Sequence, residues 1–295
     1  MSVLRGDGSG CLTLSAPAKI NLHLHVTATL ASGYHQLDTS FAFVDICDRL
    51  QVDHCDTLEV TCSRAHLNGA DNLVQQILLQ FQQRYAVCQG LRIHIDKRLP
   101  EQAGLGGGSS DAATALMAAN QLWGVRLSRQ QLIEFATPFG ADIPCFIFGR
   151  ASTAGGVGDE LSSYPYPLPD QTVLIAYPGV GLSTAEVFAR HDCALTHQIA
   201  VDTMRAPRRG GVGCNDLQPA AISLLPELGD LLAELSRYAQ LSWMSGSGSS
   251  CVALFAQRRE ALWCAQRLQS ESLAEWVHVG GLLESHPVQM DGLFE

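Results

Sequence analysis

The segment that most constrains the fold of this 295-residue chain is the run GLGGGSS at positions 104–110. Polar and apolar residues alternate over 90–100, and apolar residues recur at helical spacing over 112–123, so a strand, a loop and a helix are predicted in that order. Glycines leave consecutive backbone N–H groups uncovered, and the start of the following helix adds its dipole and further unpaired donors. We therefore predict a phosphate-binding loop, with both serine hydroxyls available to a phosphate or its magnesium ion. Its residues are Gly104, Leu105, Gly106, Gly107, Gly108, Ser109 and Ser110.

This loop matches neither of the two best-known glycine-rich motifs. No lysine follows the glycines, as the GxxxxGK[ST] motif requires, and their spacing differs from that of GxGxxG. A tight turn with positive φ is the alternative interpretation, but one or two glycines would be enough for it. The larger number of glycines favours phosphate binding.

The charge balance restricts the class of partner. The chain has 29 acidic and 19 basic residues, a formal net charge of −10, which argues against nucleic acid as the main partner because phosphate neutralisation needs a basic surface. Only two of the basic residues are lysines, Lys19 and Lys97. A lysine kept in such an arginine-rich background suggests a compact cation beside a phosphate or carboxylate.

Other features of the sequence point to a soluble protein. No run of about 18 apolar residues occurs and the N-terminus lacks the apolar core of a signal peptide, so we expect a soluble cytoplasmic protein. The ten cysteines include no CxxC pair, which favours reduced thiols over a zinc site. His23 and His25 alternate on one predicted strand, and without a third ligand we interpret them as structural.

A proline-rich stretch at 162–171 is the predicted junction between an N-terminal lobe (1–161) and a C-terminal lobe (162–295). The glycine-rich, basic segment 204–213 is predicted to be a mobile loop or, as a second interpretation, a lid over an anionic ligand.

Before the junction we expect a strand over 11–28 interrupted at Pro17, a pair of strands over 48–63, a helix over 71–87 capped by Asp71, a second helix over 127–140, and a turn followed by extended chain over 141–161. Beyond it we expect a strand at 172–179, a helix from Ser183, a helical region over 219–238 interrupted near Pro226, a loop leading into a strand over 241–256, a helix at 258–270 and a last strand over 275–283.

Three segments together resemble one superfamily. PAKINL (17–22), GLGGGSSDAA (104–113) and SGSGSSCVALF (245–255) occur in the order, and at roughly the separations, of the three motifs of the GHMP small-molecule kinases. The resemblance covers most of the chain. It implies an α+β fold of two lobes, the first like domain 2 of ribosomal protein S5 and the second ferredoxin-like, with the active site in the cleft between them.

Further segments resemble one branch of that superfamily. SGYHQLDTSF (32–41), GADIPCFIFG (140–149) and CNDLQPAA (214–221) resemble the members that use ATP and Mg²⁺ to phosphorylate the 2-hydroxyl of 4-diphosphocytidyl-2-C-methyl-D-erythritol, in the non-mevalonate route to isoprenoid precursors. The resemblance implies a small-molecule substrate and neither a nucleic-acid nor a membrane partner. A homoserine or mevalonate type of GHMP kinase and a non-catalytic nucleotide-binding protein on the same fold remain alternatives.

The same resemblance assigns roles to individual residues. It makes Asp142 the general base and Lys19 the catalytic lysine. Asn21 lies two positions from Lys19, and it either orients the hydroxyl or is a hydrogen-bonded polar residue of the strand. It also implies that Tyr34 and His35 recognise a cytosine: the tyrosine stacks on the base, and the histidine forms hydrogen bonds with its edge.

The remaining assignments concern the rest of the two ligands. The resemblance places Thr184 near the substrate phosphates or sugar and Phe188 on the other side of the base, with helix core as the alternative for Phe188. It also implies that Asn72 and Lys97 border the adenine and ribose of the nucleotide. The chain departs from the family pattern at Gln102, where a glycine is common.

Overall fold

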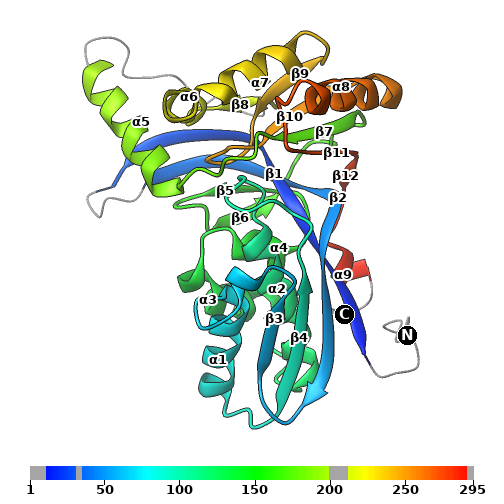
Figure 1. Cartoon of the computed structure of the whole chain (residues 1–295). Coiled ribbons are helices and arrows are strands. Elements are labelled where there is room, and N and C mark those ends of the chain that lie inside the picture. Colours follow the sequence, from blue (N-terminus) through cyan, green and yellow to red (C-terminus); the bar gives the residue numbers. More distant parts are fainter. Residues whose placement is uncertain (1–10, 31–34, 199–211, 291–295) are drawn as a thin grey trace.

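The longest elements are two antiparallel strands, β1 (Leu12–Thr29) and β2 (His35–Cys55), which pass from one lobe into the other (Figure 1). The computed structural model describes residues 11–30, 35–198 and 212–290. The pairing of β1 with β2 shifts in register between Pro17 and Ala18, because a proline has no N–H to donate to the ladder. This confirms the predicted interruption, which lies two residues before Lys19.

The N-terminal lobe is built on a mixed sheet whose central path runs β3, β4, β2, β1, β8. Helices α1 to α4 lie on one side of it (Figure 1), and their apolar side chains form a core with those of β1, β2 and β4. The other strands are β3 (Glu59–Cys62), β4 (Gly90–Asp96), β5 (Ser152–Gly155), β6 (Glu160–Ser163), β8 (Cys214–Asn215) and β12 (Leu282–Leu283); the helices are α1 (Leu73–Tyr85), α2 (Gly107–Leu122), α3 (Arg129–Ala136), α4 (Ile143–Phe148), α9 (Pro287–Met290) and the 3₁₀ turns η1 (Ala65–Leu67) and η2 (Thr137–Phe139).

Three local expectations for this lobe are wrong. The strands over 48–63 form, but β2 and β3 do not pair with each other, because β4 lies between them. Helix α1 is capped by Asn72, whose side chain accepts a hydrogen bond from Val74 N–H, and not by Asp71. The stretch expected to be extended after Asp142 is the short helix α4, which has a proline in its first turn and ends at Gly149 in the left-handed region.

The C-terminal lobe has an antiparallel sheet in the order β11, β7, β10, β9. Strand β7 is buried on both faces: Val173 and Ile175 pack in the core shared with β1 and β2, and Leu174 and Ala176 pack against the helices of this lobe. The residues 241–244, expected as loop, form β9. The elements are β7 (Thr172–Tyr177), β9 (Leu241–Met244), β10 (Cys251–Phe255), β11 (Trp276–Gly280), α5 (Thr184–Gln198), α6 (Gln218–Leu224), α7 (Pro226–Ser236) and α8 (Arg258–Ser270).

The two lobes are interlocked by the chain itself. After the proline-rich stretch the chain forms the second sheet, yet β8 pairs with β1 and β12 pairs with β2 of the first sheet. The division at residues 161 and 162 therefore remains a prediction. Most of the segment 204–213 lies outside the described residues.

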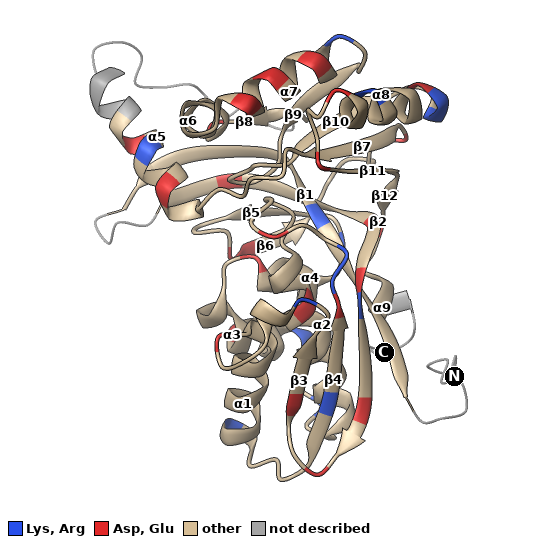
Figure 2. Cartoon of the chain, in the orientation of Figure 1, with Lys and Arg blue, Asp and Glu red and all other residues tan. Residues whose placement is uncertain are grey.

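Among the described residues, Lys and Arg are spread over many elements (Figure 2). None of the described helices has the length and apolar character needed to span a bilayer. None of the ten cysteines forms a disulfide. His23 and His25 contact Asp38 and Asp216, and within the described residues no group of three or more His, Cys, Asp or Glu side chains is arranged to hold a metal ion.

We predict that His286 makes the stability of the fold depend on pH. Its ring is buried against Phe43 and Phe146, and burial lowers its pKa to about 3, whereas the unfolded residue titrates near about 6.5. The folded state binds fewer protons between these values, so stability falls as pH decreases through this window. Relative to His286→Gln, the wild type should lose about 1.4 kcal/mol of unfolding free energy per pH unit from about pH 6 to about pH 4.

Urea denaturation of both proteins at several pH values measures this difference. The variant His54→Gln, at an exposed position of β2, is the control and should keep the wild-type slope. Equal slopes for the wild type and His286→Gln would contradict the prediction.

Candidate active site

A cleft of about 1250 Å³ lies between the lobes, bounded by the glycine-rich loop, β1, β2, the start of α5 and the loop between β9 and β10. Tyr34 lies outside the described residues. Ser110 is fully buried, its hydroxyl has no hydrogen-bond partner among the described residues, and it does not line the cleft. The other predicted site residues all line the cleft: Lys19, Asn21, His35, Asn72, Lys97, Gly104, Leu105, Gly106, Gly107, Gly108, Ser109, Asp142, Thr184 and Phe188.

The glycine-rich loop is held against the loop between β9 and β10. Gly104 has φ +73°, and a Cβ at this position would lie 2.2 Å from the carbonyl oxygen of Ser245, so only glycine fits there. Ser250 N–H donates to the carbonyl of Ala103 at 3.1 Å. The first and third motifs therefore meet at the same loop, because Lys19 N–H also donates to the carbonyl of Leu105 at 3.0 Å.

Helix α2 begins at the end of this loop. Its N-cap is Gly106, at φ +67°, and no side chain caps the helix. The N–H of Ser110 donates to the carbonyl of Gly106 at 2.8 Å, whereas the amides that precede Ser110 in the first turn have no intrahelical acceptor. These amides and the positive end of the helix dipole make the cleft wall suited to phosphate.

Lys19, Asn21 and Asp142 meet beside the loop. The ammonium of Lys19 donates to Asn21 Oδ1 at 2.6 Å and lies 3.4 Å from Asp142 Oδ2. Asn21 Nδ2 donates to Thr39 Oγ1 at 2.8 Å, so both ends of this amide are occupied. The Lys19 side chain is 4% exposed and that of Asp142 36%, which leaves the carboxylate accessible to a substrate while the ammonium is held in place.

Aromatic residues line another part of the cleft. The rings of His35 and Phe188 are stacked with centroids 4.5 Å apart and an interplanar angle of 26°. His35 Nε2 lies 2.8 and 3.0 Å from the two carboxylate oxygens of Asp192. Thr184 Oγ1 is hydrogen-bonded to Ser247 Oγ at 2.9 Å, which joins the start of α5 to the third motif.

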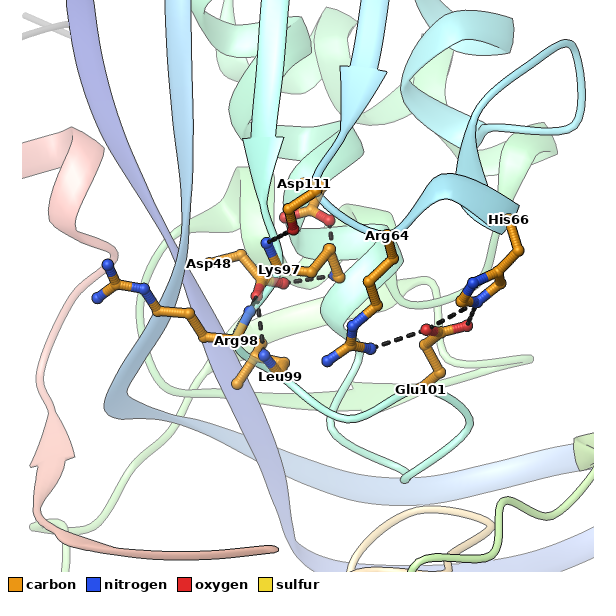
Figure 3. Close-up of polar contacts among 9 residues, drawn as sticks. Asp48, Arg64, His66, Lys97, Arg98, Leu99, Glu101 and Asp111 are labelled. Carbon is orange, nitrogen blue, oxygen red and sulfur yellow. Dashed lines mark hydrogen bonds and ion pairs between the residues drawn. The ribbon is translucent and has the colours of Figure 1, made fainter.

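The second lysine lies beside two carboxylates, one of the two settings expected of it. Figure 3 shows Lys97 between Asp48 and Asp111, with Nζ to carboxylate distances of 2.5 and 2.8 Å, and all three side chains are at most 5% exposed. The other oxygen of Asp48 accepts hydrogen bonds from the backbone N–H groups of Arg98 and Leu99. Burial, with the Asp48 charge nearby, raises the pKa of Asp111 to about 7. Asn72 is likewise occupied: its amide donates to the carbonyl of Leu67 as well as capping α1.

The departure at Gln102 has a visible consequence. Gln102 adopts φ +50°, in the region where glycine is favoured, and its carbonyl accepts a hydrogen bond from Leu182 N–H. Its Cβ lies 2.6 Å from the position where a Cβ on Gly181 would be. The neighbouring Glu101 is bound by Arg64 and His66 (Figure 3); burial alone would raise the Glu101 pKa, but these two hydrogen bonds lower it.

Several of these residues were not predicted. Asp111 follows the loop serines directly, so its position beside the phosphate loop was visible in the sequence. Asp48 lies in a strand and carries no local signal of its pairing with Lys97. Asp192 is four residues after Phe188, a spacing that places both on one face of α5, but nothing in the sequence connects it to His35.

The comparisons with known proteins agree with this architecture. The GHMP kinases N terminal domain matches residues 72–150 and the GHMP kinases C terminal domain matches residues 203–271. A 4-diphosphocytidyl-2-C-methyl-D-erythritol kinase of Bordetella parapertussis is 38% identical over 279 residues, covering 92% of this chain and 89% of that protein. One of Shewanella baltica is 38% identical over 284 residues, covering 92% and 96%.

Solved structures show the same fold. A crystal structure of 4-(cytidine 5'-diphospho)-2C-methyl-D-erythritol kinase aligns with a TM-score of 0.75 and 30% identity, over 92% of this chain and 99% of that one. A homoserine kinase from Cytophaga hutchinsonii aligns with a TM-score of 0.66 and 18% identity, over 96% and 98%. The second likeness is one of fold alone.

We predict that the two carboxylates beside Lys97 differ in their contribution to stability. Asp48→Asn places an amide against the ammonium and weakens the acceptor of two backbone N–H groups, so it should lower the unfolding free energy by about 3 kcal/mol. Asp111→Asn leaves Lys97 paired with Asp48 and should cost no more than about 1 kcal/mol at about pH 8. Urea denaturation measures both; equal costs, or the reverse order, would contradict this assignment.

A double-mutant cycle tests the contact between Gln102 and Gly181. Gly181→Ala should destabilise the wild type because the new methyl meets Gln102 Cβ, and the penalty should shrink by about 1 kcal/mol in the Gln102→Gly background. Gly281→Ala is the control, since a Cβ there meets nothing within 4 Å. Strict additivity of Gly181→Ala and Gln102→Gly would show that Gln102 does not limit residue 181.

Proposed function

This chain belongs to the GHMP kinase family and, within it, to the 4-diphosphocytidyl-2-C-methyl-D-erythritol kinases, and we propose that it transfers the γ-phosphoryl group of ATP to the 2-hydroxyl of 4-diphosphocytidyl-2-C-methyl-D-erythritol. This step belongs to the non-mevalonate route to isoprenoid precursors. The observation that carries the proposal is that Lys19 and Asp142 lie 3.4 Å apart beside the glycine-rich loop, although more than a hundred residues separate them in the chain.

ATP binds with its phosphates against Gly104–Ser109 and the start of α2. Ser109, which lines the cleft, would offer its hydroxyl oxygen to a magnesium ion that accompanies the nucleotide. The Ser110 hydroxyl is buried and does not line the cleft. Asn72 and Lys97 border the adenine and ribose. Because their polar atoms are bound within the protein, these two side chains offer the nucleotide a contact surface and not a free amide or ammonium.

Asp142 acts as the general base. The O–H bond of the 2-hydroxyl breaks, its proton passes to the Asp142 carboxylate, and the oxygen attacks the γ-phosphorus as ADP leaves. Lys19 offsets the negative charge that builds on the transferred phosphoryl group. Asn21 holds the Lys19 ammonium through its Oδ1, so we assign it a positioning role that acts through Lys19.

The cytosine of the substrate binds at His35 and Phe188. A base joined edge-on to His35 by hydrogen bonds lies in the plane of the imidazole, and the stacked Phe188 ring is close to parallel with that plane. Tyr34 supplies the other aromatic face. Thr184, at the start of α5, contacts the diphosphate or the sugar.

Two alternative functions make different demands on this cleft. A homoserine or mevalonate kinase has no base to place at His35 and Phe188. A non-catalytic nucleotide-binding protein has no need for the contact between Lys19 and Asp142. Both features are present, which supports the cytidyl substrate and a catalytic role.

We predict that Asp142→Asn lowers kcat with the cytidyl substrate by about 10²–10⁴-fold, the range typical of losing a general base, while ATP binding is retained. The measurement is ADP release from ATP and magnesium with 4-diphosphocytidyl-2-C-methyl-D-erythritol, homoserine and mevalonate offered separately. Asp170→Asn, at an exposed carboxylate outside the cleft, is the matched control and should turn over at the wild-type rate.

The outcomes separate the alternatives. Turnover of the cytidyl substrate alone supports the proposal. Turnover of only homoserine or mevalonate would keep the fold and exclude the cytosine role of His35. An absence of turnover with all three, together with retained ATP binding, would favour the nucleotide-binding protein.

A further inference from the structure

The contact between His35 and Asp192 lies outside the transfer chemistry but within the substrate cleft. His35 Nε2 is within hydrogen-bond distance of both carboxylate oxygens of Asp192, at 2.8 and 3.0 Å. The imidazole side chain is 10% exposed and the carboxylate 38%, and both residues line the cleft. They come from distant parts of the chain, β2 and α5.

This contact restricts which atoms of His35 carry protons. An ionised carboxylate only accepts hydrogen bonds, so Nε2 must be the protonated nitrogen, and in the neutral ring Nδ1 is then an acceptor. Among the described residues Nδ1 has no hydrogen-bond partner. His191 Nδ1 lies 3.8 Å from the same carboxylate, beyond hydrogen-bond distance, so it does not compete for Asp192.

The orientation of the ring is also restricted. Phe188 stacks on His35, and Asp192 lies four residues after Phe188 on the same face of α5. Phe188 therefore fixes the plane of the imidazole ring, and Asp192 fixes the direction of its Nε2 edge. A ring clamped in this way presents its second nitrogen in a fixed direction.

We infer that Asp192 is a positioning residue that sets the base specificity of the cleft: by keeping His35 Nδ1 as an acceptor, it selects a base with an amino group at position 4 over one with a carbonyl there. This rests on the proposed function, in which His35 meets the edge of the base. The cytosine amino group donates to Nδ1. A uracil presents an acceptor at the same position, and two facing acceptors exclude each other.

The first test compares 4-diphosphocytidyl-2-C-methyl-D-erythritol with its uridyl counterpart in the wild type and in Asp192→Ala. Without the carboxylate, His35 can move its proton to Nδ1 and donate to a uracil. The ratio of kcat/KM for the cytidyl over the uridyl substrate should fall by about tenfold, and kcat/KM for the uridyl substrate should itself rise. Glu186→Ala removes the same charge from an exposed position of α5 outside the cleft and should leave the ratio unchanged.

A second measurement reads the proton directly. Nitrogen-15 correlation spectra of the histidine rings distinguish Nε2–H from Nδ1–H, and the signal of His35 is identified by its absence in His35→Gln. We expect a proton on Nε2 and none on Nδ1 in the wild type, and a mixture of both tautomers in Asp192→Ala. This readout needs neither substrate nor activity.

The outcomes distinguish this inference from the proposed function. If the wild type fails to phosphorylate the cytidyl substrate, the proposed function is wrong. If it does so, and Asp192→Ala loses activity with both substrates by the same factor, Asp192 is merely structural and the inference is overturned. A changed ratio with an unchanged His35 proton would also overturn it, since Asp192 would then contact the base itself.

Discussion

The shape of the glycine-rich loop depends on a carboxylate that does not line the cleft. Asp48 is fully buried, and its two oxygens bind the Lys97 ammonium and the backbone N–H groups of Arg98 and Leu99. A buried charge is tolerated only when it is paired and hydrogen-bonded, and here all its partners come from the end of β4 and the residues that follow it. The chain must therefore leave β4 in one direction, which brings Leu99 and the glycine-rich loop to the start of α2.

The second lobe completes this arrangement. The segment 102–104 accepts hydrogen bonds from three residues of this lobe, Leu182, Ser245 and Ser250. The loop is therefore supported by β2 on one side and by the second lobe on the other. Trp243 adds a further link, since its ring N–H donates to the carbonyl of Asn21. The lysine and the phosphate loop thus share their supports, and their relative position is set by the packing of both lobes.

The sequence predicts the parts of this site whose causes are local. Glycine spacing identified the loop, and the apolar periodicity over 112–123 identified α2, because both report on neighbouring residues. The contact between Lys19 and Asp142 is long-range, and its prediction came only from resemblance to a family. The pairing of Asp48 with Lys97 had no signal at all, since a strand pattern shows which residues are buried and not which partner they meet. For the same reason β2 and β3 were expected to pair, although β4 lies between them.

Gln102 shows how a loop can depart from the preferred residue and keep its shape. A non-glycine residue in the left-handed region costs about 1–3 kcal/mol, and such a residue persists only when its surroundings hold it in place. Here Leu182 donates to the Gln102 carbonyl and Gly181 leaves room for its Cβ, so the compensation comes from the segment that leads into α5. That helix also carries Thr184, Phe188 and Asp192 along the cleft. Gln102, at the start of the glycine-rich loop, therefore contacts the same segment that carries the proposed base-contacting residues, and the backbone between 181 and 192 connects this loop with the proposed base site.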